Sequence, residues 1–162
     1  MPPMEKHGAI MLVFRDDTVL LQLREDFRVW AFPGGGVERG ERWQDAAVRE
    51  TFEETGLIVR FEREVGAYTR PNYSPGLVVH AAVGRLEGGE IRLDPHECVA
   101  ADWFPVNALP RRLLPGTRVY LADALAGGPP VTREIDMPRW QGVLWRIGFR
   151  LRDLRNAIFR RG

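Results

Sequence analysis

Apolar residues gather in short blocks along the first part of the chain, and polar or glycine-rich segments separate these blocks. The first block covers residues 8–14 and the second covers residues 18–23, with a charged link at residues 15–17. Apolar blocks of this length are typical of strands, and a short polar link between two of them is typical of a hairpin. We therefore predict an opening pair of strands, followed by a short strand at residues 30–32.

Beyond residue 57, the pattern of apolar and polar positions predicts further strands and one helix. Strands are predicted at residues 58–61, 64–68, 77–86, 91–93 and 99–104. Residues 118–126 have the pattern of a helix, which the glycine and proline pairs at 127–130 would end. We expect an α/β (α+β) fold, with one domain over residues 1–128 and a helical extension over residues 129–162.

A first helix is predicted for residues 41–55, and Gly56 is suited to end it in a left-handed conformation. At about 100° per residue, one arc of about 140° holds apolar or small residues that we expect to face the core: Ala47, Val48, Thr51, Phe52 and Thr55.

The other side of this helix carries three carboxylates, Glu50, Glu53 and Glu54. Like charges three or four residues apart destabilise a helix. A hard divalent cation such as Mg²⁺ would remove that repulsion, since it takes oxygen ligands and often shares them with substrate phosphates. A solvated acidic face is the alternative, but it explains neither the neighbouring glycines nor the spacing.

The spacing around the helix resembles the Nudix box. Gly35, five residues, Glu41, seven residues and then RETFEETGL at 49–57 match the box at every charged and glycine position. Thr51 stands where the pattern has an aliphatic residue, a departure that a β-branched side chain tolerates. The segment WAFPGG at 30–35 is similar to the one that precedes the box in this family.

The resemblance implies a fold, a reaction and a metal site. Nudix proteins fold as a mixed β-sheet sandwiched between helices, and they mostly hydrolyse a nucleoside diphosphate linked to another moiety with Mg²⁺ or Mn²⁺. By this resemblance, Glu50, Glu53 and Glu54 would hold the metal together with the main-chain carbonyl of Gly34. Bound metal can neutralise phosphate oxygens and activate a water molecule, which is what phosphoanhydride cleavage needs.

Two residues are candidates for the general base. Glu53 is one, because a ligand carboxylate can also hold the attacking water. Glu97 is the other, because the family often supplies a further carboxylate from a later loop; an ordinary loop acid is the alternative reading of Glu97. Arg49 is expected to orient a neighbouring glutamate, and Glu41 to support the same arrangement.

Candidates for substrate contacts are Arg24, Trp30 and Tyr73. Arg24 could meet a phosphate, and either ring could stack on a base, although loop or core packing is the alternative for each. Tyr73 resembles the tyrosine of dinucleoside polyphosphate hydrolases, whereas the prolines at 71 and 75 resemble that of ADP-ribose pyrophosphatases. The expected substrate is therefore a nucleotide-derived small molecule of either type, with no specific nucleic acid as partner. A catalytically silent module that binds a nucleotide and regulates a partner is the alternative function, against which the complete glutamate set argues.

The composition indicates the size of the domain and the compartment of the protein. A chain of 162 residues with 44% hydrophobic residues suits one domain with a sizeable core. Cys98 is the only cysteine, which excludes an intramolecular disulfide and indicates a reducing, cytoplasmic environment. The apolar run near the start is too short for a signal peptide.

The periodicity of apolar residues in the last part of the chain predicts an amphipathic helix. Apolar residues recur at steps of three and four, with Gly148 as a candidate break: Trp140, Leu144, Ile147, Leu151, Leu154 and Ile158. Residues 139–162 hold seven arginines and one acid, Asp153, a balance of +6. We expect the apolar stripe to pack on protein, within the chain or across a homodimer, with the arginines in water. Contact with an anionic membrane surface is the alternative.

Overall fold

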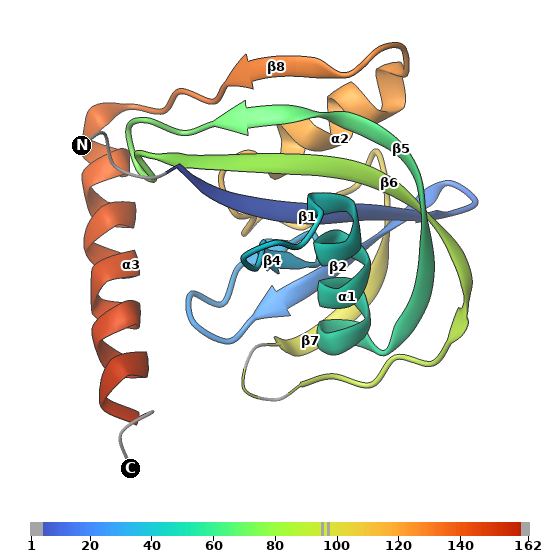
Figure 1. Ribbon diagram of the computed structural model, residues 1–162, viewed down its shortest axis with the longest axis horizontal. Coiled ribbons are helices and arrows are strands. Elements are labelled where there is room, and N and C mark those ends of the chain that lie inside the picture. The colour runs from blue at the N-terminus through green and yellow to red at the C-terminus, as the bar shows by residue number, and fades with distance from the viewer. Residues whose placement is uncertain (1–4, 95, 97, 160–162) are drawn as a thin grey trace.

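The computed structural model describes residues 5–94, 96 and 98–159. Its elements, in chain order and as drawn in Figure 1, are β1 (Lys6–Arg15), β2 (Thr18–Arg24), β3 (Trp30–Ala31), β4 (Gly34–Gly36), α1 (Trp43–Thr55), β5 (Leu57–Thr69), β6 (Leu77–Gly89), β7 (Cys98–Pro105), α2 (Thr117–Ala126), β8 (Val131–Glu134) and α3 (Arg139–Phe159).

The strands form a mixed sheet, as the α+β prediction required. Its order is β3-β2-β1-β6-β5-β8, with β4 paired to β1 and β7 paired to β2. The opening hairpin of β1 and β2 is antiparallel, as predicted, whereas β1 runs parallel to β6 and β5 runs parallel to β8. The long antiparallel pair of β5 and β6 completes the scaffold.

The sheet lies between two helices because its strands bury both faces. Successive side chains of a strand point to opposite faces, so Leu12 of β1 joins one core cluster while Met11 and Val13 join the other. Helix α2 covers the first cluster with Tyr120 and Leu121, and α1 covers the second (Figure 1). This confirms the predicted sandwich of a mixed sheet between helices.

The predicted strands differ from the structure in several places. Residues 57–69 form one strand, and its irregular register at several points explains the polar interruption that suggested two. The strand predicted at residues 91–93 is wrong: β6 continues through Gly88 and Gly89 to pair with Leu57 and Ile58, and no strand follows it before Cys98 among the described residues. Strand β8 was missed, because three of its four residues are exposed and leave no apolar signal.

The C-terminal extension begins as part of the domain, since β8 joins the edge of the sheet at β5. Helix α3 then runs beside the domain, past the ends of β5 and β6, without covering a sheet face (Figure 1). It continues through Gly148 without the candidate break. Over the described part of the chain, no helix is long and apolar enough to cross a membrane.

Candidate active site

Helix α1 begins and ends close to the predicted positions. It starts at Trp43, so Glu41 lies in the turn before it, where its N–H donates to the carbonyl of Glu38 (3.1 Å). At the other end, Gly56 has φ 76° and donates its N–H to the carbonyl of Phe52 (2.8 Å). The left-handed conformation predicted for Gly56 is therefore confirmed. A side chain there would also meet the carbonyl of Glu90, 2.6 Å from the ideal Cβ position.

The buried face of α1 is rotated from the predicted one. It consists of Ala46, Ala47, Thr51, Glu54 and Thr55. Phe52, which we expected in the core, is 56% exposed. The two threonines tolerate burial because each hydroxyl donates to a carbonyl one helical turn earlier, Thr51 to Ala47 (2.7 Å) and Thr55 to Thr51 (2.6 Å). The rotation carries Glu54 from the acidic side of the helix into the interior.

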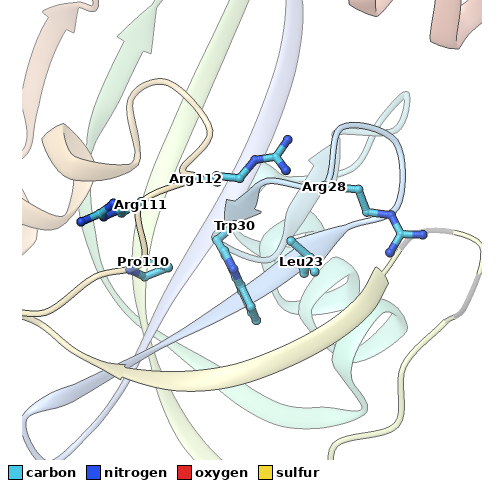
Figure 2. Close-up of a pocket in the computed structure, with 6 residues that line it drawn as sticks. All are labelled: Leu23, Arg28, Trp30, Pro110, Arg111 and Arg112. Atoms are coloured by element: carbon cyan, nitrogen blue, oxygen red, sulfur yellow. The ribbon is translucent and has the colours of Figure 1, made fainter.

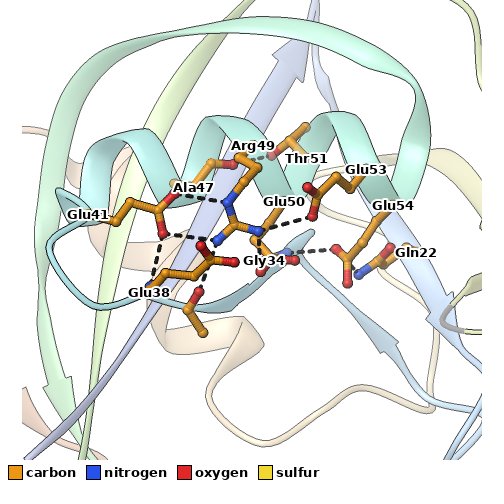
Figure 3. Close-up of polar contacts among 11 residues, drawn as sticks. Gln22, Gly34, Glu38, Glu41, Ala47, Arg49, Glu50, Thr51, Glu53 and Glu54 are labelled. Atoms are coloured by element: carbon orange, nitrogen blue, oxygen red, sulfur yellow. Dashed lines mark hydrogen bonds and ion pairs between the residues drawn. The ribbon is translucent and has the colours of Figure 1, made fainter. Parts of the chain in front are cut away.

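Glu54 is a buried carboxylate with two hydrogen-bond donors. Its Oε2 accepts from Nε2 of Gln22 (2.6 Å) and from the N–H of Gly34 (2.8 Å), as Figure 3 shows. Burial, with a smaller contribution from the charge of Glu50, raises the pKa of Glu54 to about 8, although both donors act in the opposite direction. Gln22 was not predicted as part of the site, although a polar residue inside the apolar strand β2 is a signal for such a role.

The raised pKa makes the metal-free stability depend on pH. The pKa of the Glu54 carboxyl is 4.5 in the unfolded chain and about 8 in the folded protein. The contribution of Glu54 to stability is therefore complete below pH 4.5 and is lost as the pH rises to about 8. We expect Glu54→Gln to flatten the fall in melting temperature over this range, measured with a chelator present. Glu62→Gln, at an exposed position of β5, is the matched control; parallel pH profiles for wild type and Glu54→Gln would contradict this prediction.

Arg49 gathers the other carboxylates (Figure 3). Its Nε and Nη2 donate to both oxygens of Glu41 (2.8 and 3.0 Å), and its Nη1 donates to Glu50 and to Glu53 (3.0 Å each). Nη2 also donates to the carbonyl of Gly36 (3.1 Å). The guanidinium lowers the pKa of Glu41 to about 2, and the carboxylates raise the pKa of Arg49. One side chain thus links the loop before α1 to two carboxylates on the helix.

The glycines at β4 bring the main chain against this cluster. A Cβ on Gly35 would lie 2.5 Å from the carboxyl carbon of Glu50. A Cβ on Gly34 would lie 2.2 Å from the carbonyl oxygen of Ala9, because β4 pairs closely with β1. Only glycine fits these positions without displacing β1 or Glu50, and this close approach places the main chain of Gly34 beside Glu54.

The chemistry of these donors fits a hard cation, although they are not gathered around one point. Three carboxylates and the main chain of Gly34 lie at one end of α1, and oxygen atoms are the ligands that Mg²⁺ prefers. As the side chains stand, no group of three His, Cys, Asp or Glu among the described residues could hold a metal ion. Glu50 and Glu53 point instead to Arg49, and Glu54 to Gln22 (Figure 3).

A pocket adjoins β2 and β3. It has a volume of about 490 Å³ and is lined by Leu23, Arg28, Trp30, Pro110, Arg111 and Arg112 (Figure 2). Trp30, a predicted substrate contact, forms a T-shaped pair with Phe104, with 4.7 Å between ring centroids, and also lines this pocket. The N–H of Trp30 donates to the carbonyl of Arg112 (2.8 Å). This hydrogen bond places the loop at residues 110–112 beside β3. We did not predict Arg111 and Arg112 as pocket residues, because this pairing joins segments about eighty residues apart and leaves no local signal.

The other predicted contacts lie elsewhere. The guanidinium of Arg24 binds the carboxylate of Asp26 through two hydrogen bonds (3.0 and 2.7 Å). Tyr73 is 1% exposed, and its hydroxyl donates to the carbonyl of Pro115 (3.2 Å) and lies 3.3 Å from Nη1 of Arg70. Its ring is enclosed in this conformation, so it offers no surface on which a base could stack. Glu97 lies outside the described residues.

Comparisons with known families, curated proteins and solved structures all identify the same family. The model of the NUDIX domain matches residues 4–124. A protein of Bacillus subtilis (strain 168) with the provisional name 8-oxo-dGTP diphosphatase is 32% identical over 129 residues, which cover 79% of this chain and 85% of that protein. The NAD-capped RNA hydrolase NudC of Photorhabdus laumondii is 35% identical over 121 residues, 68% of this chain but only 46% of the relative. The crystal structure of an ADP-ribose pyrophosphatase from Streptococcus suis superposes with a TM-score of 0.66 at 27% identity, covering 81% of this chain and 99% of that one.

Proposed function

This chain belongs to the Nudix family and is a hydrolase of phosphoanhydride bonds, and we propose that it uses Mg²⁺ or Mn²⁺ to cleave a nucleoside diphosphate linked to another moiety. The observation that carries the proposal is the cluster at the end of α1, where Arg49 binds Glu50 and Glu53 while Glu54 lies beside the main chain of Gly34. A cytoplasmic location belongs to the same proposal and rests on the single, buried Cys98.

The metal ligands would be Glu50, Glu53, Glu54 and the carbonyl of Gly34. A bound divalent cation would neutralise phosphate oxygens and lower the pKa of a coordinated water. It would also compensate the charge of Glu54, whose burial otherwise keeps the carboxyl protonated to about pH 8. Arg49 donates to Glu50 and to Glu53 at 3.0 Å each and so orients both carboxylates.

Glu53 is the general base that the described residues favour. Its side chain is 54% exposed against 13% for Glu50, so water reaches it freely. Glu97 remains the second candidate from the sequence.

The pocket at Trp30 is the proposed site for the nucleotide part of the substrate. An indole ring can stack on a base, and the cationic side chains of Arg28, Arg111 and Arg112 suit an anionic ligand. ADP-ribose-like molecules and dinucleoside polyphosphates both combine a base with negative charge. The relatives named above, for 8-oxo-dGTP, NAD-capped RNA and ADP-ribose, are consistent with nucleotide-derived substrates.

Arg112→Ala is expected to raise KM about tenfold with little change in kcat, because a lost charged hydrogen bond weakens binding by about 1.5 kcal/mol. The side chain is exposed, so the fold should persist. Arg118→Ala, an equally exposed position on α2, is the control. Equal KM values for Arg112→Ala and Arg118→Ala would show that the pocket does not bind the substrate.

A substrate screen tests the function itself. ADP-ribose, 8-oxo-dGTP, NAD and dinucleoside polyphosphates would each be incubated with the chain and Mg²⁺, Mn²⁺ or a chelator, and the released mononucleotides quantified. We expect metal-dependent release from at least one of them. Nucleotide binding by calorimetry without turnover on any substrate would favour the alternative, a silent regulatory module.

A further inference from the structure

Helix α3 contacts its own domain through only part of its circumference. A Cβ on Gly142 would lie 2.5 Å from the carbonyl oxygen of Asn72, and one on Gly148 would lie 2.8 Å from Cε1 of Phe27. Between them, Trp145 meets Phe27 edge-on, with 5.2 Å between ring centroids. These positions recur every three residues, so the same side of α3 packs on the domain along its first half.

A different side of α3 is apolar and open to solvent. Its members, with their exposed fractions, are Trp140 (64%), Val143 (42%), Leu144 (60%), Ile147 (50%) and Leu151 (62%). At about 100° per residue these five residues occupy an arc of about 100°, centred about 150° from the contact side, over a length of about 16 Å. These five residues, which we call the exposed stripe, do not pack on their own domain, so of the two partners predicted from the sequence only a second copy of the chain remains. A contiguous exposed apolar surface of this kind marks an interaction site.

Basic side chains lie along one edge of the exposed stripe. Arg146 and Arg150 are exposed and follow each other one turn apart on the helix, next to Val143. Residues 139–152 contain no acidic residue, and residues 139–162 have a balance of +6, while the rest of the chain has −5. The positive charge of the protein is thus concentrated on the segment that carries the exposed stripe.

We propose that the exposed stripe of α3 docks the protein on an anionic lipid surface. An amphipathic helix with a basic border lies in the plane of a membrane, with its apolar side chains among the acyl chains and its cations at the headgroups. Tryptophan, here Trp140, is favoured at that depth. Because the domain holds the opposite side of α3, docking requires no rearrangement of the fold.

Charge favours lipid over a second copy of the chain. Two stripes packed on each other would bring Arg146 and Arg150 of one copy near the arginine-rich flank of the other, and residues 139–152 offer no acid to neutralise them. Anionic headgroups provide the missing counter-charge.

Vesicle co-sedimentation of the full chain tests the proposal. Vesicles of phosphatidylcholine alone are compared with equal parts of phosphatidylcholine and phosphatidylglycerol, at low and high salt. We expect pelleting with the anionic vesicles, weakened by salt. No pelleting, or equal pelleting with neutral vesicles, overturns the proposal.

Two double variants separate the apolar and charged contributions. Leu144→Gln with Leu151→Gln should weaken vesicle partition roughly 100-fold, since both leucines would enter the lipid. Arg146→Gln with Arg150→Gln should weaken it roughly 30-fold and reduce the salt dependence. Leu125→Gln, a 54% exposed leucine on α2, is the control and should bind as the wild type does. Unchanged partition of the leucine variant overturns the proposal.

The homodimer predicted from the sequence is the competing outcome. Sedimentation velocity without lipid gives the oligomeric state of the wild type and of the leucine variant. A monomer in both supports the lipid surface. A wild-type dimer that the leucine variant abolishes, with no vesicle binding, assigns the stripe to a second copy.

Discussion

Replacing Glu54 by glutamine is expected to lower kcat/KM about 100-fold or more while the chain stays folded, and Glu53→Gln should do the same. The physical reason is the loss of a carboxylate from the proposed metal site. The amide of Glu54→Gln keeps an oxygen that can accept from Gln22 and from the N–H of Gly34, so the buried contacts persist. Glu53 is half exposed, and its removal leaves the interior unchanged.

The measurement is the rate at saturating metal on the best substrate of the screen, with thermal unfolding measured in parallel. Saturating metal separates weakened metal binding from a lost chemical step. Glu62→Gln, an exposed acid outside the cluster, should retain full activity. Near-normal turnover in both Glu53→Gln and Glu54→Gln would remove these residues from the metal site.

Arg49→Ala is expected to lower both stability and activity, with kcat falling about tenfold or more. The guanidinium donates five hydrogen bonds, which reach Glu41, Glu50, Glu53 and the carbonyl of Gly36. Without it, the partly buried carboxylates of Glu41 and Glu50 lose a cation at hydrogen-bond distance and repel each other and Glu53. Arg49→Lys should rescue little, because an ammonium cannot reproduce the planar fork that binds both oxygens of Glu41.

The control for Arg49 is Arg42, the residue that immediately precedes helix α1. Arg42 approaches Asp45 at 3.9 Å, but both side chains are largely exposed, and such ion pairs contribute little. Arg42→Ala should therefore leave the melting temperature and kcat nearly unchanged. If Arg49→Lys equals the wild type in both measurements, the bidentate geometry is not what the site requires.

The sequence by itself determined the family, the reaction class and most of the strands. The spacing from Gly35 through Glu41 to Gly56 depends on local rules: a glycine for close approach, a helix of fixed length and a glycine to end it. The opening hairpin and the amphipathic pattern of α3 are equally local, since each follows from the periodicity of adjacent residues.

Only the tertiary structure decided which side of each helix is buried. For α1, the pattern placed Phe52 inside and Glu54 outside, but Gln22 and Gly34 satisfy the carboxylate and draw it into the interior. For α3, the pattern allowed the stripe to pack on its own domain or on a second copy, and the contacts with Phe27 and Asn72 place the opposite side of the helix against the domain. In both cases the partners come from distant segments, and the free energy of those contacts outweighs the preference that the local pattern expresses. The pocket of three arginines has the same origin, because it exists only where the loop at residues 110–112 meets Trp30.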